Sequence, residues 1–177
     1  ICRLSHPYVV RTFGACTDDA SELVLVMELA EGGTLRDMLR SKRGGALTDP
    51  ERLQMVSQIA AGMSYLHSRE IAHRDLKSLN VLLRKGACKI ADFGLSREDD
   101  GVTATSTVGV LGTPAWSAPE VLQGKMDSPG AAFKADVYSF GVTIWEIYSC
   151  KTPWDGMKPL WIMNEVTNNK KSLDISA

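Results

Sequence analysis

The feature that most constrains the fold is a long amphipathic segment that begins at Thr48. Residues 48–51 read Thr-Asp-Pro-Glu, which combines a capping hydroxyl, a proline for the first helical turn and a glutamate at capping-box spacing. Behind this start signal, apolar residues recur at three- and four-residue intervals over about five turns. They are Leu53, Val56, Ile59, Ala60, Met63 and Leu66. The pattern predicts a helix with one buried face.

Four short apolar runs are typical of two β-hairpins. The predicted turn of the first hairpin is the polar segment 17–21, and that of the second is Arg84-Lys85-Gly86. The runs that would form the strands occupy residues 8–13, 22–27, 81–83 and 88–91.

Three further helices are predicted. Thr34 has capping-box spacing and starts a short helix, residues 136–148 are apolar on nearly all sides, and residues 160–166 form a weaker helix. Residues 96–114 are polar and rich in Gly and Thr, which indicates a long loop of the kind that is usually functional or disordered. Two hairpins followed by a mainly helical remainder indicate an α+β fold.

Composition excludes several classes of protein. The 177 residues include 20 Lys+Arg and 21 Asp+Glu, a net charge of −1, and 44% are hydrophobic. These values argue against a disordered chain and against a dedicated nucleic-acid binder, which carries a basic excess. The longest uncharged stretch, 101–119, is too rich in Thr, Ser, Gly and Pro to span a bilayer, and no targeting leader is visible. The four cysteines lie far apart, which favours reduced thiols and a cytoplasmic location.

Three short motifs follow one another along the chain. Residues 73–80 read HRDLKSLN, residues 92–94 read DFG and residues 118–120 read APE. In these motifs the chain resembles the protein kinase family, whose signature set has the same order. Lys77 and the Gly-Thr-Pro at 112–114 are similar to kinases that act on Ser and Thr. HRDLKSLN and the DVYSFG run at 136–141 are similar to the tyrosine-kinase-like group, which mostly phosphorylates Ser and Thr.

The resemblance implies a fold and an activity. It implies a kinase-like α+β domain with a mainly helical C-terminal lobe and a remnant β-hairpin and hinge of the N-terminal lobe. Residues 1–30 would be the end of the N-terminal lobe and the hinge, and residues 31–177 the C-terminal lobe. The implied activity is transfer of the ATP γ-phosphate to a hydroxyl of a protein substrate, with Ser/Thr or dual specificity left open.

The resemblance also assigns roles in catalysis. Asp75 would accept the proton of the substrate hydroxyl and orient it, and Lys77 would approach the γ-phosphate of ATP as a positive charge. Asn80 and Asp92 would supply hard oxygen ligands to Mg²⁺. His73, despite its place in the motif, is expected to be structural.

A nucleotide site is implied at the end of the first hairpin. Residues 27–30 resemble the kinase hinge, so backbone groups of Glu28 and Ala30 would bond the adenine edge. Met27 would be the gatekeeper, and Leu82 would pack beneath the ring. A plain strand end followed by a Gly-Gly loop is the alternative.

The segment 92–120 resembles an activation segment. Phosphorylation by an upstream kinase or by the protein itself is expected to order it through Arg74, since a phosphate brings about −1.5 to −2 charges. A flexible solvated loop is the alternative. Thr113 and Asp136 are expected to contact the catalytic loop and hold it. The candidate phosphorylation sites are Thr103, Thr105, Ser106 and Thr107.

The chain departs from the family pattern at both ends. No Gly-rich loop, strand lysine or helix glutamate precedes residue 30, and no arginine follows to pair with Glu120. We therefore expect a piece of a longer kinase that has little activity alone and aggregates through its exposed hairpin. The alternative is a catalytically inactive, kinase-like binding or scaffold module, which substituted catalytic positions upstream would favour.

Overall fold

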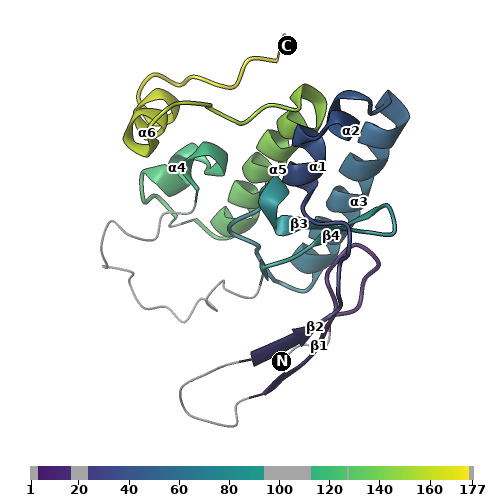
Figure 1. Ribbon diagram of the computed structural model, residues 1–177. Coiled ribbons are helices and arrows are strands. Elements are labelled where there is room, and N and C mark those ends of the chain that lie inside the picture. The colour runs from purple at the N-terminus through teal and green to yellow at the C-terminus, as the bar shows by residue number, and fades with distance from the viewer. Residues whose placement is uncertain (1–3, 17–23, 94–112, 127, 176–177) are drawn as a thin grey trace.

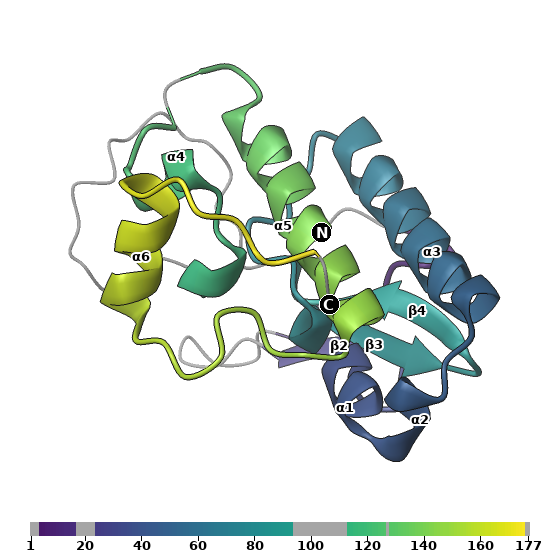
Figure 2. The same ribbon diagram turned by 90° about the horizontal axis from the view of Figure 1, so that it is seen from above.

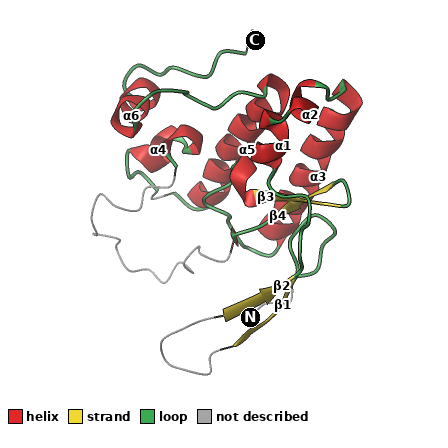
Figure 3. Cartoon of the chain, in the orientation of Figure 1, coloured by secondary structure: helices red, strands yellow, loops and turns green. Residues whose placement is uncertain are grey.

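The computed structural model describes residues 4–16, 24–93, 113–126 and 128–175. Its helices gather on one side of the molecule, and a two-stranded hairpin projects away from them (Figure 1; Figure 3). Within the described ranges, no helix combines the length and apolar character that crossing a bilayer requires.

The long predicted helix is α3 (Asp49–Ser68). Its capping box is formed, because the Thr48 N–H donates to the Glu51 carboxylate at 2.8 Å while the Thr48 hydroxyl accepts from the Glu51 N–H. Ile59 and Leu66 are fully buried, as predicted. The prediction for Leu53 was wrong: this residue is 59% exposed, because Met55 and Val56 are the residues that face the core at this end of α3.

The first hairpin consists of β1 (Thr12–Cys16) and β2 (Val24–Met27), which pair in antiparallel register. The hairpin is confirmed, but its first strand begins four residues later than the predicted start at residue 8. Residues 8–10 instead pair with the second hairpin: the Val10 N–H donates to the Ile90 carbonyl at 2.8 Å, and the Ile90 N–H to the Tyr8 carbonyl at 2.9 Å. The predicted turn at 17–21 lies outside the described residues.

The second predicted hairpin is formed by β3 (Val81–Arg84) and β4 (Ala87–Ile90). Helix α3 packs on β4 through Gly62. A Cβ at this glycine would lie 2.7 Å from the Ile90 Cδ1 atom and 2.8 Å from the Tyr8 carbonyl oxygen. A side chain there would therefore force the helix away from the strand.

The other helices complete the C-terminal part. The predicted helices at Thr34 and at residues 136–148 and 160–166 are present, the second of them beginning earlier than predicted. The elements are α1 (Leu35–Arg40), α2 (Lys42–Gly45), α4 (Pro119–Leu122), α5 (Ala131–Ser149) and α6 (Pro159–Thr167), with short 3₁₀ turns η1 (Ser78–Asn80) and η3 (Pro114–Trp116).

Helix α5 is the centre of the helical part. In the view from above it runs between α3 on one side and the pair α4 and α6 on the other (Figure 2). One apolar cluster joins it to α1, α3 and the β3–β4 hairpin through Ile147, and a second joins it to η3, α4 and α6 through Val142. A single helix thus supports both the segment before β3 and the segment that contains the APE motif.

Candidate active site

The start of the catalytic loop, residues 73–80, is held in place by the Asp136 carboxylate of α5. Asp136, only 1% exposed, accepts hydrogen bonds from the backbone N–H groups of His73 at 2.8 Å and Arg74 at 2.7 Å. Its Oδ2 atom also lies 2.9 Å from Nε2 of His67 at the end of α3. The predicted contact of Asp136 with the loop is therefore confirmed, while its partner His67 was not predicted.

Three predicted site residues meet within this loop. The Lys77 ammonium lies 2.6 Å from Oδ2 of Asp75, and the Asn80 side-chain amide donates to the same oxygen at 3.0 Å and to the Asp75 carbonyl at 2.8 Å. The Asp75 side chain is 39% exposed, whereas that of Lys77 is 14% exposed. The Asp75 carboxylate is thus oriented from the protein side and open to solvent.

The loop is joined to the segment before the APE motif. The Lys77 ammonium donates to the Thr113 hydroxyl at 2.7 Å, which confirms the predicted contact of Thr113 with the catalytic loop. We call residues 113–117 the Trp116 segment, after its buried tryptophan.

Asp92 follows β4 at the point where that strand meets the catalytic loop. The Ala91 N–H donates to the Asn80 carbonyl at 2.9 Å, so the residue before Asp92 is bonded directly to the loop. Asp92 is exposed, and its φ of 59° is in the left-handed region. Such a conformation costs about 1–3 kcal/mol for a non-glycine residue and clusters at functional sites.

The donor set of Asn80 and Asp92 suits a divalent cation. The amide nitrogen of Asn80 faces Asp75, so its amide oxygen is the atom that remains for a ligand. An amide oxygen and a carboxylate are hard donors, and Mg²⁺ is usually held by one or two carboxylates together with substrate phosphates. By the chemistry of their donor atoms, the two residues fit a magnesium ion.

His73 is a buried support of Asp75. Burial lowers the pKa of His73, so the ring is neutral near pH 7 and Nδ1 can accept the Asp75 N–H at 3.3 Å. This structural role agrees with the prediction.

The hinge residues are anchored to the β3–β4 hairpin. The Glu28 carboxylate, 8% exposed, accepts from the Lys89 ammonium at 2.7 Å and from the Arg84 guanidinium at 3.1 Å. Burial alone would raise the pKa of Glu28, but the hydrogen bonds from Lys89 and the Arg11 backbone hold it below the ordinary value. The sequence predicted a role for the backbone of Glu28, in bonding the adenine edge, and none for its side chain. The sequence signal for a role of its side chain was Lys89, because a lysine within a buried strand needs a charged partner.

The segment that follows the hinge lies beside Leu82. The Gly32 N–H donates to the Leu83 carbonyl at 2.8 Å, and Thr34 forms a bridge with Leu82. Only glycine permits the first contact, because a Cβ at Gly32 would lie 2.6 Å from that carbonyl oxygen. The segment after Ala30 is therefore held against the strand that carries Leu82.

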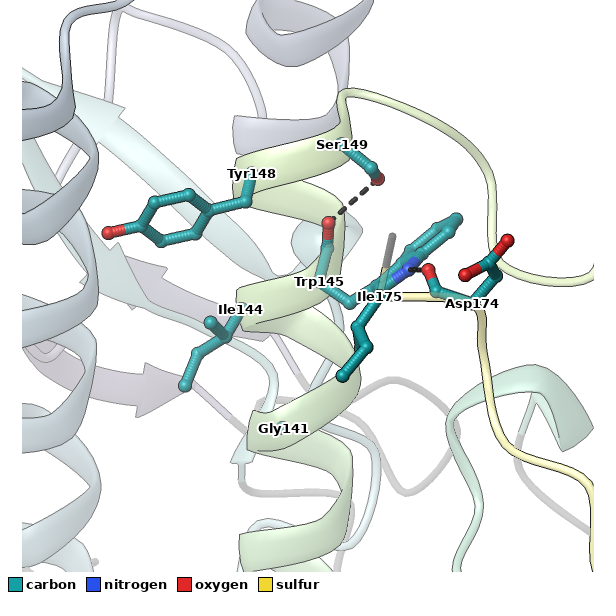
Figure 4. Close-up of a pocket in the computed structure, with 7 residues that line it drawn as sticks. All are labelled: Gly141, Ile144, Trp145, Tyr148, Ser149, Asp174 and Ile175. Carbon is teal, nitrogen blue, oxygen red and sulfur yellow. Dashed lines mark hydrogen bonds between the residues drawn. The ribbon is translucent and has the colours of Figure 1, made fainter. Parts of the chain in front are cut away.

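A separate cavity lies beside α5. It has a volume of about 220 Å³ and contains none of the predicted site residues. The Trp145 indole donates to the Asp174 carbonyl at 2.6 Å at its edge (Figure 4). Its lining residues are Gly141, Ile144, Trp145, Tyr148, Ser149, Asp174 and Ile175.

Comparison with known proteins supports the resemblance. The family described as protein tyrosine and serine/threonine kinase matches residues 1–176. The chain is 40% identical over 98% of its length to the serine/threonine-protein kinase CTR1 of Arabidopsis thaliana, of which it covers 21%. It is 39% identical over 85% of its length to human mitogen-activated protein kinase kinase kinase 3, of which it covers 24%.

A tyrosine kinase is also among its relatives. The chain is 44% identical over 82% of its length to the tyrosine-protein kinase transforming protein Fps of an avian sarcoma virus (strain PRCII), of which it covers 26%. The chain thus spans about a quarter or less of the length of these relatives. Because the family match runs through nearly the whole chain, and because the motif residues meet at one loop, this chain belongs to the protein kinase family.

Proposed function

We propose that this chain is part of a protein serine/threonine kinase that transfers the γ-phosphate of ATP to a hydroxyl of a protein substrate. Residues 31–177 form its C-terminal lobe, and residues 1–30 contribute the end of the N-terminal lobe and the hinge. The observation that carries the proposal is the contact set within the catalytic loop, where Lys77 and Asn80 both bond the Asp75 carboxylate.

Each residue of the set has a part in phosphoryl transfer. The transition state is loose and spreads charge over the phosphoryl oxygens, so the protein acts mainly by positioning and charge compensation. Asp75, fixed by Lys77 and Asn80, orients the substrate hydroxyl and accepts its proton. The Lys77 ammonium lies next to this carboxylate and offsets negative charge on the γ-phosphate.

Protein kinases generally use ATP and Mg²⁺. In this chain Asn80 and Asp92 would hold the metal, which compensates charge on the phosphates when bound. Backbone groups of Glu28 and Ala30 would bond the adenine edge, with Leu82 beneath the ring. The bonds that Glu28 receives from the β3–β4 hairpin favour this arrangement, since they fix the hinge relative to Leu82.

Serine and threonine are the proposed acceptors. The bond from Lys77 to Thr113 supports this preference, as does the similarity to the serine/threonine-protein kinase CTR1. The Fps relative makes tyrosine the competing acceptor.

Regulation by phosphorylation and a cytoplasmic location complete the proposal. The proposed phosphorylation sites are Thr103, Thr105, Ser106 and Thr107. An upstream kinase or the protein itself would phosphorylate them. These four residues lie outside the described ranges, so the proposal for them rests on the sequence. The location rests on the separated cysteines, of which Cys88 and Cys150 are free thiols.

The test is transfer of labelled γ-phosphate by the complete kinase domain that contains this chain. We expect labelling of Ser and Thr in protein substrates and no comparable labelling of Tyr. D75N should lower kcat about 10²–10⁴-fold, the range for loss of a general base. D155N, which alters an exposed aspartate between α5 and α6, is the matched control and should retain activity. ATP binding without transfer by the wild type would favour the scaffold alternative instead.

A further inference from the structure

The segment before β1 contains a histidine whose ring contacts two tyrosines. His6 stacks on Tyr65 of α3, with ring centroids 4.8 Å apart and 15° between the planes, and it lies T-shaped to Tyr8 at 5.6 Å. Nδ1 of His6 accepts the Tyr8 N–H at 3.2 Å, and the Tyr65 hydroxyl accepts the Ser5 N–H at 3.0 Å. These contacts join residues 5–8 to α3.

The same segment is also bonded to β4. The Ile90 N–H donates to the Tyr8 carbonyl at 2.9 Å. Lys89 directly precedes Ile90, and its ammonium lies 2.7 Å from the Glu28 carboxylate in the hinge. His6 therefore belongs to the set of contacts that connects the first hairpin and the hinge to the helical part of the molecule.

Protonation of the His6 ring would weaken this set of contacts. An imidazolium carries an N–H at both nitrogens, so Nδ1 could no longer accept from the Tyr8 N–H. Burial and the charge of Lys89 lower the pKa of His6 from 6.5, so the ring is neutral near pH 7. The neutral ring thus contributes stability that is present above pH 6.5 and is lost as the pH falls through the folded-state pKa.

Stacking on Tyr65 is the one described contact that would favour a charged ring, because the face of a tyrosine attracts cations. The Arg69 guanidinium already lies over Tyr65, 5.5 Å from its centroid. The charged groups that face His6 and its stacking partner are therefore Arg69 on α3 and Lys89 on β4, the second of them paired with Glu28. A further positive charge is disfavoured beside these two cations.

We propose that His6 is a proton-sensitive clamp, which holds residues 5–8 on α3 and β4 when its ring is neutral and releases them when the ring is protonated. This inference concerns conformation and goes beyond the proposed function. Its effect on phosphate transfer rests on that function. Residues 5–8 lead into β1 and Lys89 holds the hinge, so release in acid should misplace the hinge and lower turnover.

The first test is an NMR titration of the ¹⁵N-labelled complete kinase domain. The His6 ring should titrate below pH 6.5, and the Tyr8 amide signal should move with the same midpoint. H67N changes another histidine, near the end of α3, and is the matched control that should leave the Tyr8 titration in place. A Tyr8 signal that does not follow His6, or a His6 ring that titrates at or above pH 6.5, would overturn the clamp.

The second test uses H6N, which separates the charge from the hydrogen bond. Asparagine accepts from the backbone N–H two residues on, as Nδ1 of His6 does, and it has no titratable group. We expect the ratio of the Ile90 amide exchange rates in wild type and H6N to rise about 2- to 10-fold between about pH 7.5 and about pH 5.5, the equivalent of one hydrogen bond. A constant ratio would contradict the clamp.

Transfer kinetics connect the clamp to the proposed function. Over the same pH range, kcat of the wild type should fall about 2- to 10-fold further than that of H6N. Equal pH profiles of kcat would show that the clamp has no part in turnover. A wild type without transfer activity would contradict the proposed function alone, because the titration and the exchange experiment need no activity. The titration follows wild-type signals and therefore decides even if H6N does not fold.

Discussion

The Lys77 ammonium donates to the Thr113 hydroxyl at 2.7 Å, across 36 residues of sequence. The same ammonium lies 2.6 Å from the Asp75 carboxylate. One cation therefore joins the proposed general base to the segment that leads into the APE motif. Because this contact depends on two separate segments, it should be sensitive to the loss of a single hydroxyl group.

T113V removes that hydroxyl and keeps the shape of the side chain. We expect kcat to fall about 10- to 100-fold, the equivalent of one hydrogen bond to a charged group. The measurement is steady-state phosphate transfer by the complete domain. T167V is the matched control, because the Thr167 hydroxyl donates to the Met163 carbonyl within α6, away from the catalytic loop. Equal kcat values for T113V and wild type would show that the contact has no part in turnover.

D136N should destabilise the protein by about 1–3 kcal/mol, the cost of leaving a buried hydrogen-bonding group unpaired. The carboxylate accepts from two backbone N–H groups through different oxygens, at His73 and Arg74. An amide presents an N–H₂ group to one of them and cannot accept there. Urea denaturation measures the loss, with the exposed D155N as the control. A D136N protein as stable as wild type would contradict the role of Asp136 as the anchor of the loop.

E28Q should destabilise the protein by about 1–3 kcal/mol at neutral pH, because Lys89 loses its charged partner. The pKa of Glu28 is lowered from its ordinary value of 4.5 in the folded protein. The carboxylate therefore contributes stability that is present above pH 4.5 and is lost as the pH falls through the folded-state pKa.

Urea denaturation of wild type and E28Q at neutral pH and at about pH 3 checks this sign. The difference between the two proteins should shrink in acid. E31Q is the control, because the Glu31 side chain is 52% exposed and lies 3.9 Å from Arg84. It should change stability by less than about 1 kcal/mol, as surface ion pairs do. If the difference in stability between wild type and E28Q grows in acid, Glu28 is not a carboxylate that stabilises the folded protein in its charged form.

Local patterns in the sequence predicted the elements but not all of their partners. The capping box at Thr48 and the turn at Arg84-Lys85-Gly86 depend on residues close in sequence, and both are where they were predicted. Residues 8–10 alternate like a hairpin strand yet pair with Ile90, a contact that no local pattern records. The start of β1 was therefore misplaced.

The same distinction between local patterns and distant partners applies to the candidate site. The roles of Asp75, Lys77 and Asn80 were implied by the resemblance of residues 73–80 to the kinase motif, and the structure brings these residues together. Glu146 bonds Ser78 across 68 residues, and a glutamate in an apolar helix carries no sign of its partner. The one available signal was its charge, since a buried carboxylate in such a helix requires donors.

G62A tests the packing of α3 on the β3–β4 hairpin. Alanine is the better helix former by about 1 kcal/mol, so propensity alone predicts a more stable protein. At this site, however, the added Cβ would lie 2.7 Å from Ile90 and 2.8 Å from the Tyr8 carbonyl, closer than real Cβ contacts. Overpacking of this kind costs about 1–3 kcal/mol, so we expect a lower free energy of unfolding.

The matched control for G62A is G141A in α5. Gly141 is also within a long helix, but apart from its chain neighbours and its own helix backbone, no atom of the described residues lies within 4 Å of the position where its Cβ would be. Helix propensity is therefore unopposed, and G141A should stabilise the protein by about 0.5–1 kcal/mol. Urea denaturation of the two variants should thus give changes of opposite sign. If both stabilise the protein, α3 does not approach the Tyr8 backbone as closely as described.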